Sequence, residues 1–186
     1  MKKEILNAIV PYNCTVTNGQ INFTSECNKQ ICVRIKRESD FFGLSLNGYS
    51  IITLSFESSV LSTVQNPGRL SYTISELTSK ILTKEPNNII HYICSHKGYK
   101  LGQANNYKFS GMRLRLFRRW HYIYSKVFSD IKHYIVNTEP TEENKEPIEM
   151  GFLYHSTCSN FKEIEENLDL LIAAEIPDKP VIKAEL

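Results

Sequence analysis

The amino-acid sequence predicts an α+β protein, in which a single mixed, mainly antiparallel sheet of about seven strands is covered by about three helices. Three features of the element order predict this class. Four β-rich segments come first. A helix and a central strand follow them. A second helix, two strands and a last helix complete the order. We expect one domain over residues 1–174 and a C-terminal tail over residues 175–186.

Turn residues and apolar alternation define the first four strands. Asn18-Gly19 joins two β-rich runs within residues 14–24, and this dipeptide favours the positive φ angles of a two-residue hairpin turn. Residues 30–37 alternate apolar and polar side chains, which is typical of a strand with one face in water. Residues 49–57 are the fourth predicted strand.

The next segment changes to helical periodicity. Four apolar side chains lie on one stripe of a helix predicted over residues 66–82: Leu70, Ile74, Leu77 and Ile81. Asn66 and Pro67 suit the N-cap and first turn of this helix. Residues 87–95 are short, β-branched and aromatic, which predicts a central strand.

Residues 112–128 combine basic and large apolar side chains. Wound into a helix at about 100° per residue, their apolar side chains fill an arc of roughly 200°, wider than one sheet needs. The arc consists of Met112, Leu114, Leu116, Phe117, Trp120, Ile123, Tyr124, Val127 and Phe128. The opposite side carries Arg115, Arg118, Arg119, Tyr122 and Lys126. Either the chain's own sheet and last helix cover this arc, or a second copy of the chain covers part of it. Because the arc is so wide, we expect a homodimer.

Two more strands and a helix complete the predicted fold. Residues 131–137 and 148–155 have the pattern of strands, and the segment between them is polar and contains prolines. The last helix is predicted over residues 160–175, with Asn160 and Glu163 placed to cap its start.

Charge is distributed unevenly along the chain. Residues 80–132 contain 11 basic and 2 acidic side chains, a net charge of +9, whereas residues 133–186 contain 4 and 12, a net charge of −8. This asymmetry favours an anionic partner for the middle segment, contact between the two later segments, or two ordinary solvated surfaces. The chain has no signal-like or membrane-spanning apolar run, and its 5 cysteines form no CxxC pair. We therefore expect a cytoplasmic protein without a membrane partner.

Local sequence motifs identify no catalytic residue and no metal site. His91, Cys94 and His96 lie close in sequence, but His91 and Cys94 project to opposite faces of a strand and cannot share one tetrahedral ion. The signatures of serine hydrolases, kinases, zinc proteases and nucleotide-binding loops do not occur.

Two segments resemble the GNAT superfamily of acyltransferases. Strand 49–57 leads to Gln65-Asn66-Pro67-Gly68-Arg69-Leu70 at a helix start, similar to the Q/R-x-x-G-x-G/A turn that receives the pyrophosphate of coenzyme A in that superfamily. Residues 124–128 are similar to the end of its later helix, before the final two strands. The resemblance implies that Gln65, Gly68 and Arg69 bind acetyl-coenzyme A and that Tyr124 is the general acid. Leu70 replaces the last small residue of the motif, and Pro67 removes one amide.

A second resemblance covers about residues 12–174. A helix ending near Glu85-Pro86, the strand NNIIHYICS, an asparagine-containing loop and a basic helix of pattern F..WH.IY resemble a family of small bacterial proteins, a domain of unknown function. This resemblance implies a fold and a bacterial cytoplasm, and no activity.

We interpret the chain as a non-enzymatic bacterial accessory protein that binds nucleic acid or a nucleic-acid-handling protein, and phage defence is one context that fits. The phosphate contacts are predicted at basic residues, with Tyr122 as a surface for a base: Lys97, Lys100, Lys108, Arg115, Arg118, Arg119 and Lys126. Two alternatives stay open. One is a GNAT-like acyltransferase that uses acetyl-coenzyme A, and the other is a protein-interaction module without nucleic-acid contact.

Overall fold

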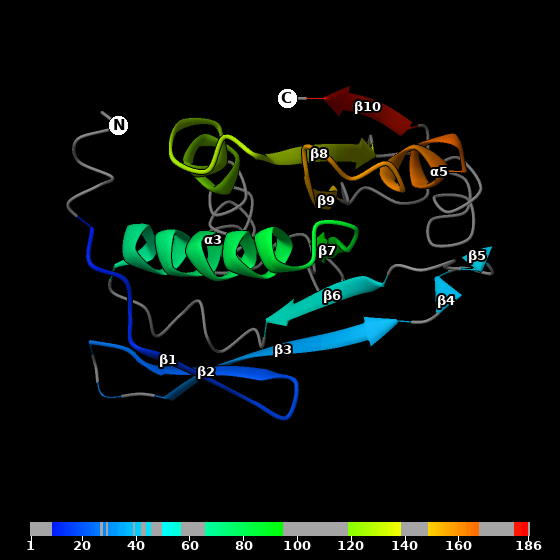
Figure 1. Ribbon diagram of the computed structural model, residues 1–186. Coiled ribbons are helices and arrows are strands. Elements are labelled where there is room, and N and C mark those ends of the chain that lie inside the picture. The colour runs from blue at the N-terminus through cyan, green and yellow to red at the C-terminus, as the bar shows by residue number, and fades with distance from the viewer. Residues whose placement is uncertain are drawn as a thin grey trace, which may run out of the picture.

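The computed structural model describes residues 9–26, 28, 30–38, 40–41, 44–45, 50–56, 66–94, 119–138, 149–167 and 181–185. These residues form an eight-stranded mixed sheet with the order β1-β2-β3-β6-β7-β9-β8-β10 (Figure 1). Its strands are β1 (Cys14–Thr17), β2 (Gln20–Thr24), β3 (Gln30–Glu38), β6 (Ile51–Phe56), β7 (Ile89–Cys94), β8 (Ile131–Thr138), β9 (Glu149–His155) and β10 (Val181–Glu185). A separate two-stranded sheet pairs β4 (Asp40–Phe41) with β5 (Leu44–Ser45). The predicted α+β class, with one mixed and mainly antiparallel sheet, is confirmed.

The Asn18-Gly19 hairpin turn forms as predicted. Both residues have positive φ, 49° and 71°, and Thr17 pairs with Gln20 across the turn. Glycine is required at the second position for a further reason. A Cβ atom on Gly19 would lie 2.8 Å from the carbonyl oxygen of Ile35, whose own amide donates to the Gly19 carbonyl over 2.6 Å.

Helix α3 (Pro67–Lys84) begins where the sequence predicts, and the Asn66 side chain accepts a hydrogen bond from the Arg69 amide over 3.0 Å. Its buried face is rotated from the predicted stripe. Leu70 and Ile74 are fully buried, but Leu77 and Ile81 are only partly buried. Small hydroxyl residues take part of the core-facing side instead: Ser71, Thr73, Ser75 and Thr78. Three of their hydroxyls donate to carbonyls one turn earlier, which satisfies them inside the core.

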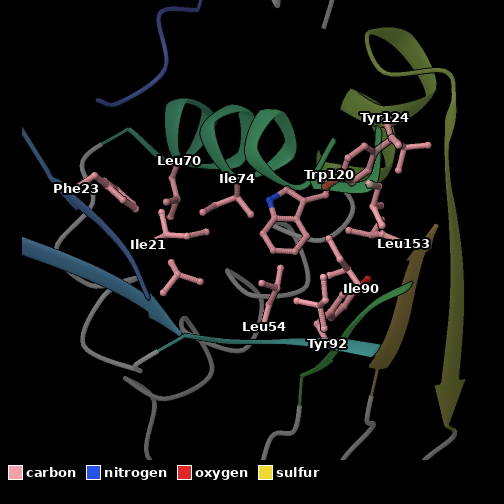
Figure 2. Packing of buried hydrophobic residues seen from close by; sticks show 14 of the residues in the cluster. Ile21, Phe23, Leu54, Leu70, Ile74, Ile90, Tyr92, Trp120, Tyr124 and Leu153 are labelled. Carbon is pink, nitrogen blue, oxygen red and sulfur yellow. The ribbon is translucent and has the colours of Figure 1, made fainter. Parts of the chain in front are cut away.

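Two cores lie on opposite faces of the sheet. Successive residues of β9, Phe152 and Leu153, belong to different cores, as alternation along a strand requires. The Leu153 face is covered by α3 and by helical residues 119–126, and Figure 2 shows Trp120 packed between Ile74 of α3 and the strands below it. The Phe152 face is covered by α5 (Phe161–Glu166), whose Phe161 is buried there.

Two features of the C-terminal part were not predicted from the sequence. Residues 181–185, which lie in the predicted C-terminal tail, form β10, which pairs antiparallel with β8 and covers what would be an exposed strand edge. Asn160 does not cap α5 through its side chain, which donates instead to the Asn87 carbonyl over 3.4 Å. The predicted helix residues 168–175 lie outside the described part. Within the described ranges, no helix has both the length and the apolar character needed to cross a lipid bilayer.

Candidate functional site

In the large sheet, the neighbouring strands β6 and β7 pair over only part of their length. Among the described strands of this sheet, β6 and β7 run parallel, whereas the other neighbours run antiparallel. Their register joins Ile51, Ile52 and Thr53 to Ile89, Ile90 and His91. It stops there, although β6 continues to Phe56 and β7 continues to Cys94.

Each strand keeps its outer neighbour beyond that point. Residues 54–56 of β6 still pair with β3, and residues 92–94 of β7 still pair with β9. The sheet therefore divides into two antiparallel halves at the carboxyl ends of its parallel strands. We call the facing edges of residues 54–56 and 92–94 the seam.

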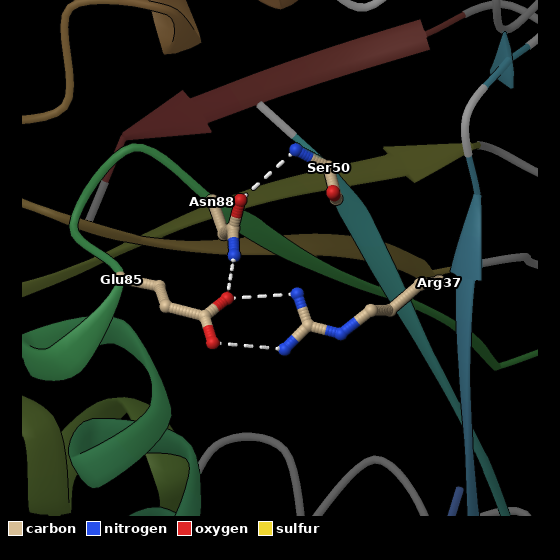
Figure 3. Close-up of polar contacts among 4 residues, drawn as sticks. All are labelled: Arg37, Ser50, Glu85 and Asn88. Atoms are coloured by element: carbon tan, nitrogen blue, oxygen red, sulfur yellow. Dashed lines mark hydrogen bonds and ion pairs between the residues drawn. The ribbon is translucent and has the colours of Figure 1, made fainter. Parts of the chain in front are cut away.

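The amino ends of the same two strands are tied together by hydrogen bonds. The Asn88 side chain accepts a hydrogen bond from the Ser50 amide over 2.9 Å and donates one to Glu85 (Figure 3). Glu85 binds Arg37 of β3 through two hydrogen bonds of 2.7 and 3.1 Å, and this pairing lowers the pKa of the Glu85 carboxyl. The Ile89 amide also donates to the Ser50 carbonyl over 3.1 Å. The strands are thus fixed at one end and free to diverge at the other.

Helix α3 begins on the side toward which β6 runs (Figure 1). Its first-turn amides are partly occupied, because the Arg69 amide donates to the Asn66 side chain and the Leu70 amide to the Asn66 carbonyl. The Arg69 guanidinium lies 4.2 Å from the centre of the Tyr12 ring and donates to the Pro11 carbonyl. Arg69 therefore packs against the N-terminal segment. Gln65 lies outside the described residues.

Tyr124 is inside the core rather than at a surface. Its side chain is 1% exposed, and its hydroxyl lies 2.5 Å from the Thr78 hydroxyl of α3. Burial raises the pKa of Tyr124 above its ordinary value. The hydroxyl is therefore protonated at neutral pH, but it faces a core hydroxyl and not solvent.

Beside Tyr124 lies a group of buried aromatic and imidazole rings that sequence reasoning missed. We call Tyr92, His121, Tyr124 and His133 the histidine cluster. The Tyr92 hydroxyl lies 2.7 Å from His133 Nε2, and the His133 ring centre is 5.7 Å from that of His121 and 6.0 Å from that of Tyr124. Gly151 provides the space for Tyr92, because a Cβ atom there would lie 2.1 Å from the Tyr92 ring.

Burial determines the protonation of both histidines in the cluster. His133 is 3% exposed, and burial, followed by the nearby charge of His121, lowers the pKa of His133 to about 3. Burial also lowers the pKa of the partly exposed His121. Within the described part of the chain, the Nδ1 atoms of both rings are buried and have no hydrogen-bond partner. Both imidazoles are therefore neutral at neutral pH.

The histidines considered from sequence have a different environment. His91 is buried on the opposite face of β7, its ring centre 5.1 Å from that of Phe152, and burial lowers the pKa of His91 to about 3. His96 lies outside the described residues. No three histidine, cysteine or carboxylate side chains come close enough to hold a metal ion within the described part.

The described part of the predicted basic helix has the expected two sides. Trp120, Ile123 and Tyr124 are buried, Arg119 and Lys126 are exposed, and Tyr122 is partly exposed. Trp120 and Tyr124 pack against the chain's own sheet and α3, whereas α5, in the predicted last helix, covers the opposite face of the sheet and not this arc. The remaining predicted contact residues lie outside the described part: Lys97, Lys100, Lys108, Arg115 and Arg118.

Comparisons with protein-family models, with curated proteins and with solved structures find no match to this chain. The candidate site consists of the seam, the start of α3 and the histidine cluster.

Replacing Asn88 tests how the closed end of the seam is held. Asn88→Ala removes the acceptor of the Ser50 amide, and we expect it to lower the free energy of unfolding by about 1–3 kcal/mol, the usual penalty when a buried polar group loses its partner. The control is Arg37→Ala, which removes an ion pair that is 50% exposed at the arginine and should cost less than about 1 kcal/mol. Urea denaturation measures both variants. Equal losses would contradict the role assigned to Asn88.

Acid should destabilise the fold before ordinary carboxylates protonate. His91 and His133, with native pKa values of about 3, take up protons at pH 5 to 6.5 only when the chain unfolds. Stability is therefore complete above pH 6.5 and falls with decreasing pH, by about 2 kcal/mol for each histidine between pH 7 and 5. His133→Gln should remove the contribution of His133, about 2 kcal/mol between pH 7 and 5. Urea denaturation at several pH values tests this, and a pH-independent stability would refute it.

Proposed function

We propose that the protein binds coenzyme A, or an acyl ester of it, along the seam, as its resemblance to the GNAT acyltransferases implies. One observation carries the proposal. The parallel pairing of β6 with β7 stops after Thr53 and His91, three residues before either strand ends. Ligands of sheets with parallel strands bind beyond the carboxyl ends of those strands, which is where this pairing is lost.

The chemistry of coenzyme A suits such a seam. Its pantetheine arm is an extended chain with two amide groups, and strand edges bind extended amide chains through backbone hydrogen bonds. Its phosphates favour the positive end of a helix. Gly68 at the start of α3 supports this, because its amide is not used by the Asn66 cap that takes the next two amides.

The core side of the seam is lined by Trp120. Leu54 of β6 and Tyr92 of β7 lie in the same core cluster as this indole, and Figure 2 shows Trp120 above both side chains. Trp120 meets the Tyr92 ring edge-on, with 5.7 Å between ring centres. A ligand in the seam would therefore change the surroundings of the chain's single tryptophan. We assign Tyr124 no step, because its hydroxyl is bonded to Thr78 inside the core.

Substitutions at Gly68 can test coenzyme A binding without disturbing the fold. Saturating coenzyme A should raise the melting temperature and shift the emission of Trp120. Gly68→Asp should weaken coenzyme A binding at least about tenfold, because the aspartate carboxylate repels the phosphates. The same substitution should not destabilise α3, because an acidic side chain in the first turn stabilises a helix. Gly68→Ala is the control, since its Cβ atom would meet the nearest other atom, Asn66 Oδ1, at 3.4 Å. Unchanged melting temperature and emission at saturating coenzyme A would overturn the proposal.

A second candidate function is the binding of a nucleic acid by the exposed side of helical residues 119–126. The observation that favours it is the state of Arg119 and Lys126, which are exposed and pair with no carboxylate in the part of the chain that the structure describes. Unpaired cations on one helix side are available for phosphate contacts, and the partly exposed Tyr122 lies between them in sequence. Phosphate contacts of this kind carry no sequence preference.

Charge reversal tests the second candidate. A single-stranded oligonucleotide labelled with fluorescein should bind with an affinity that falls as salt rises, and fluorescence anisotropy measures this. Reversing both Arg119 and Lys126 to glutamate should reduce the slope of log affinity against log salt by about 1.4, about 0.7 for each lost contact. Lys162→Glu, on the exposed surface of α5, is the matched control. Binding that survives the double reversal unchanged would exclude this surface.

A further inference from the structure

We propose that β1 pairs antiparallel with the β1 strand of a second copy of this chain, across a two-fold axis, so that the two large sheets become continuous. β1 is at one end of the strand order and pairs with β2 alone among the described strands, and Figure 1 shows it at the edge of the sheet away from β10. The seam lies between β6 and β7, further along that order. The inference therefore depends on neither of the proposed ligands.

Two apolar side chains near this edge are exposed. Val10 is 72% exposed and Val16 is 59% exposed, and these two are the exposed large apolar side chains among the residues that the structure describes. A single exposed valine is ordinary on a protein surface. Here both belong to residues 10–17, the segment that ends in β1, whose outer side has no strand neighbour within the described ranges.

The two edges of the sheet differ in the features that prevent pairing with another chain. Natural edge strands carry lysine or other charged residues, proline or a bulge, which block the approach of another strand. β10 contains Lys183, and Pro180 precedes it in the sequence. β1 has the sequence Cys-Thr-Val-Thr, with no charge and no proline, and its register with β2 is continuous without a bulge. The β1 edge therefore lacks this protection.

The composition of β1 favours a second copy of the chain as the partner. A two-fold axis sets each residue of an antiparallel pair opposite a residue of the same strand in the other copy. Like charges in those positions would repel each other, and β1 has no charged residue in any register. Its threonines and valine are β-branched, and such side chains pack well against each other across paired strands. An acidic or basic peptide would find no complementary charge in β1 itself.

The proposed pairing continues the core face of the sheet from one copy to the other. Tyr12 and Cys14 pack in or against the core that α3 covers. Side chains alternate along a strand, so Val16 projects to the same face as Cys14, where it is mainly exposed. A two-fold axis perpendicular to the sheet keeps this face on the same side in both copies. It brings Val16 opposite either Cys14 or Val16 of the second copy, which removes its side chain from water.

Contacts of Tyr12 hold the segment before β1 in place. Its amide donates to Thr73 Oγ1 of α3 over 3.0 Å, and its ring stacks on Phe23 of β2 with 5.0 Å between ring centres. The Arg69 guanidinium lies 4.2 Å from the same ring centre. The edge is therefore ordered in the single chain, which avoids the entropy cost that an unfixed segment adds to association.

The test measures the association of the full chain, with a reducing agent present so that the cysteines do not crosslink. A contact between strands of four residues is small, so we expect a weak dimer with a dissociation constant of about 10–1000 µM. Sedimentation velocity at increasing concentration should show the average mass rising toward twice that of one chain. Amide hydrogen exchange at low and high concentration should show added protection in β1 and none in β10.

Lysine substitutions in β1 test whether this edge forms the contact. Val16→Lys and Thr15→Lys should each weaken the dimer at least about tenfold, because each puts a charge into the edge strand. Both residues are exposed, so the melting temperature of each variant should stay close to that of the wild type. Thr24→Lys changes an exposed residue of β2 and is the matched control, which should dimerise like the wild type.

Four outcomes would overturn the proposal. They are a chain that stays monomeric at the highest concentration, a dimer that survives both β1 variants, equal weakening by Thr24→Lys, and concentration-dependent protection that appears elsewhere but not in β1. The hydrogen-exchange result needs no variant, so the proposal stays testable even if a lysine substitution prevents folding.

Discussion

The short parallel contact between β6 and β7 is the constraint on which the rest of the structure depends. Three residue pairs join the two antiparallel halves of the sheet, and the Asn88 bonds close the contact at its amino end. Antiparallel neighbours can be joined by tight turns, but parallel neighbours need a crossover, and here α3 supplies it. This crossover places the start of α3 beyond the carboxyl ends of β6 and β7, where the two strands no longer pair. The same connection therefore produces both the seam and the helix N-terminus beside it.

Packing above the seam shows how the same constraint shapes the core. Where β6 and β7 no longer pair, Trp120 packs in one core cluster with Leu54 of β6 and Tyr92 of β7. Most of their neighbours in this core are apolar, but the Tyr92 hydroxyl leads to a polar group that consists of His133, His121, Tyr124 and Thr78. An apolar set would pack with less desolvation cost. The polar group therefore carries a desolvation cost, which its internal hydrogen bonds offset only in part.

The sequence predicted what depends on local patterns. The Asn18-Gly19 turn and the Asn66 cap follow from backbone preferences of a few residues, and both are present. The seam depends on where pairing stops, which is a property of two strands and their neighbours and has no local signature. His121 and His133 were missed because they are unremarkable in sequence, and only packing the helix onto β8 brings them together. Residues 181–185 were missed because five residues form a strand only when an edge is there to pair with.

The two proposed functions meet in one helix and differ in which side of it they use. Trp120 and Tyr124 face the sheet, whereas Arg119 and Lys126 face away from it. Coenzyme A and nucleic acid are both phosphorylated ligands, so a positive charge on this part of the chain favours either one and cannot decide between them. The buried side of helical residues 119–126, which faces the seam, distinguishes the two proposals. A binding surface for nucleic acid needs no opened strand pair, whereas the proposed coenzyme A site does, and for that reason the buried side favours coenzyme A.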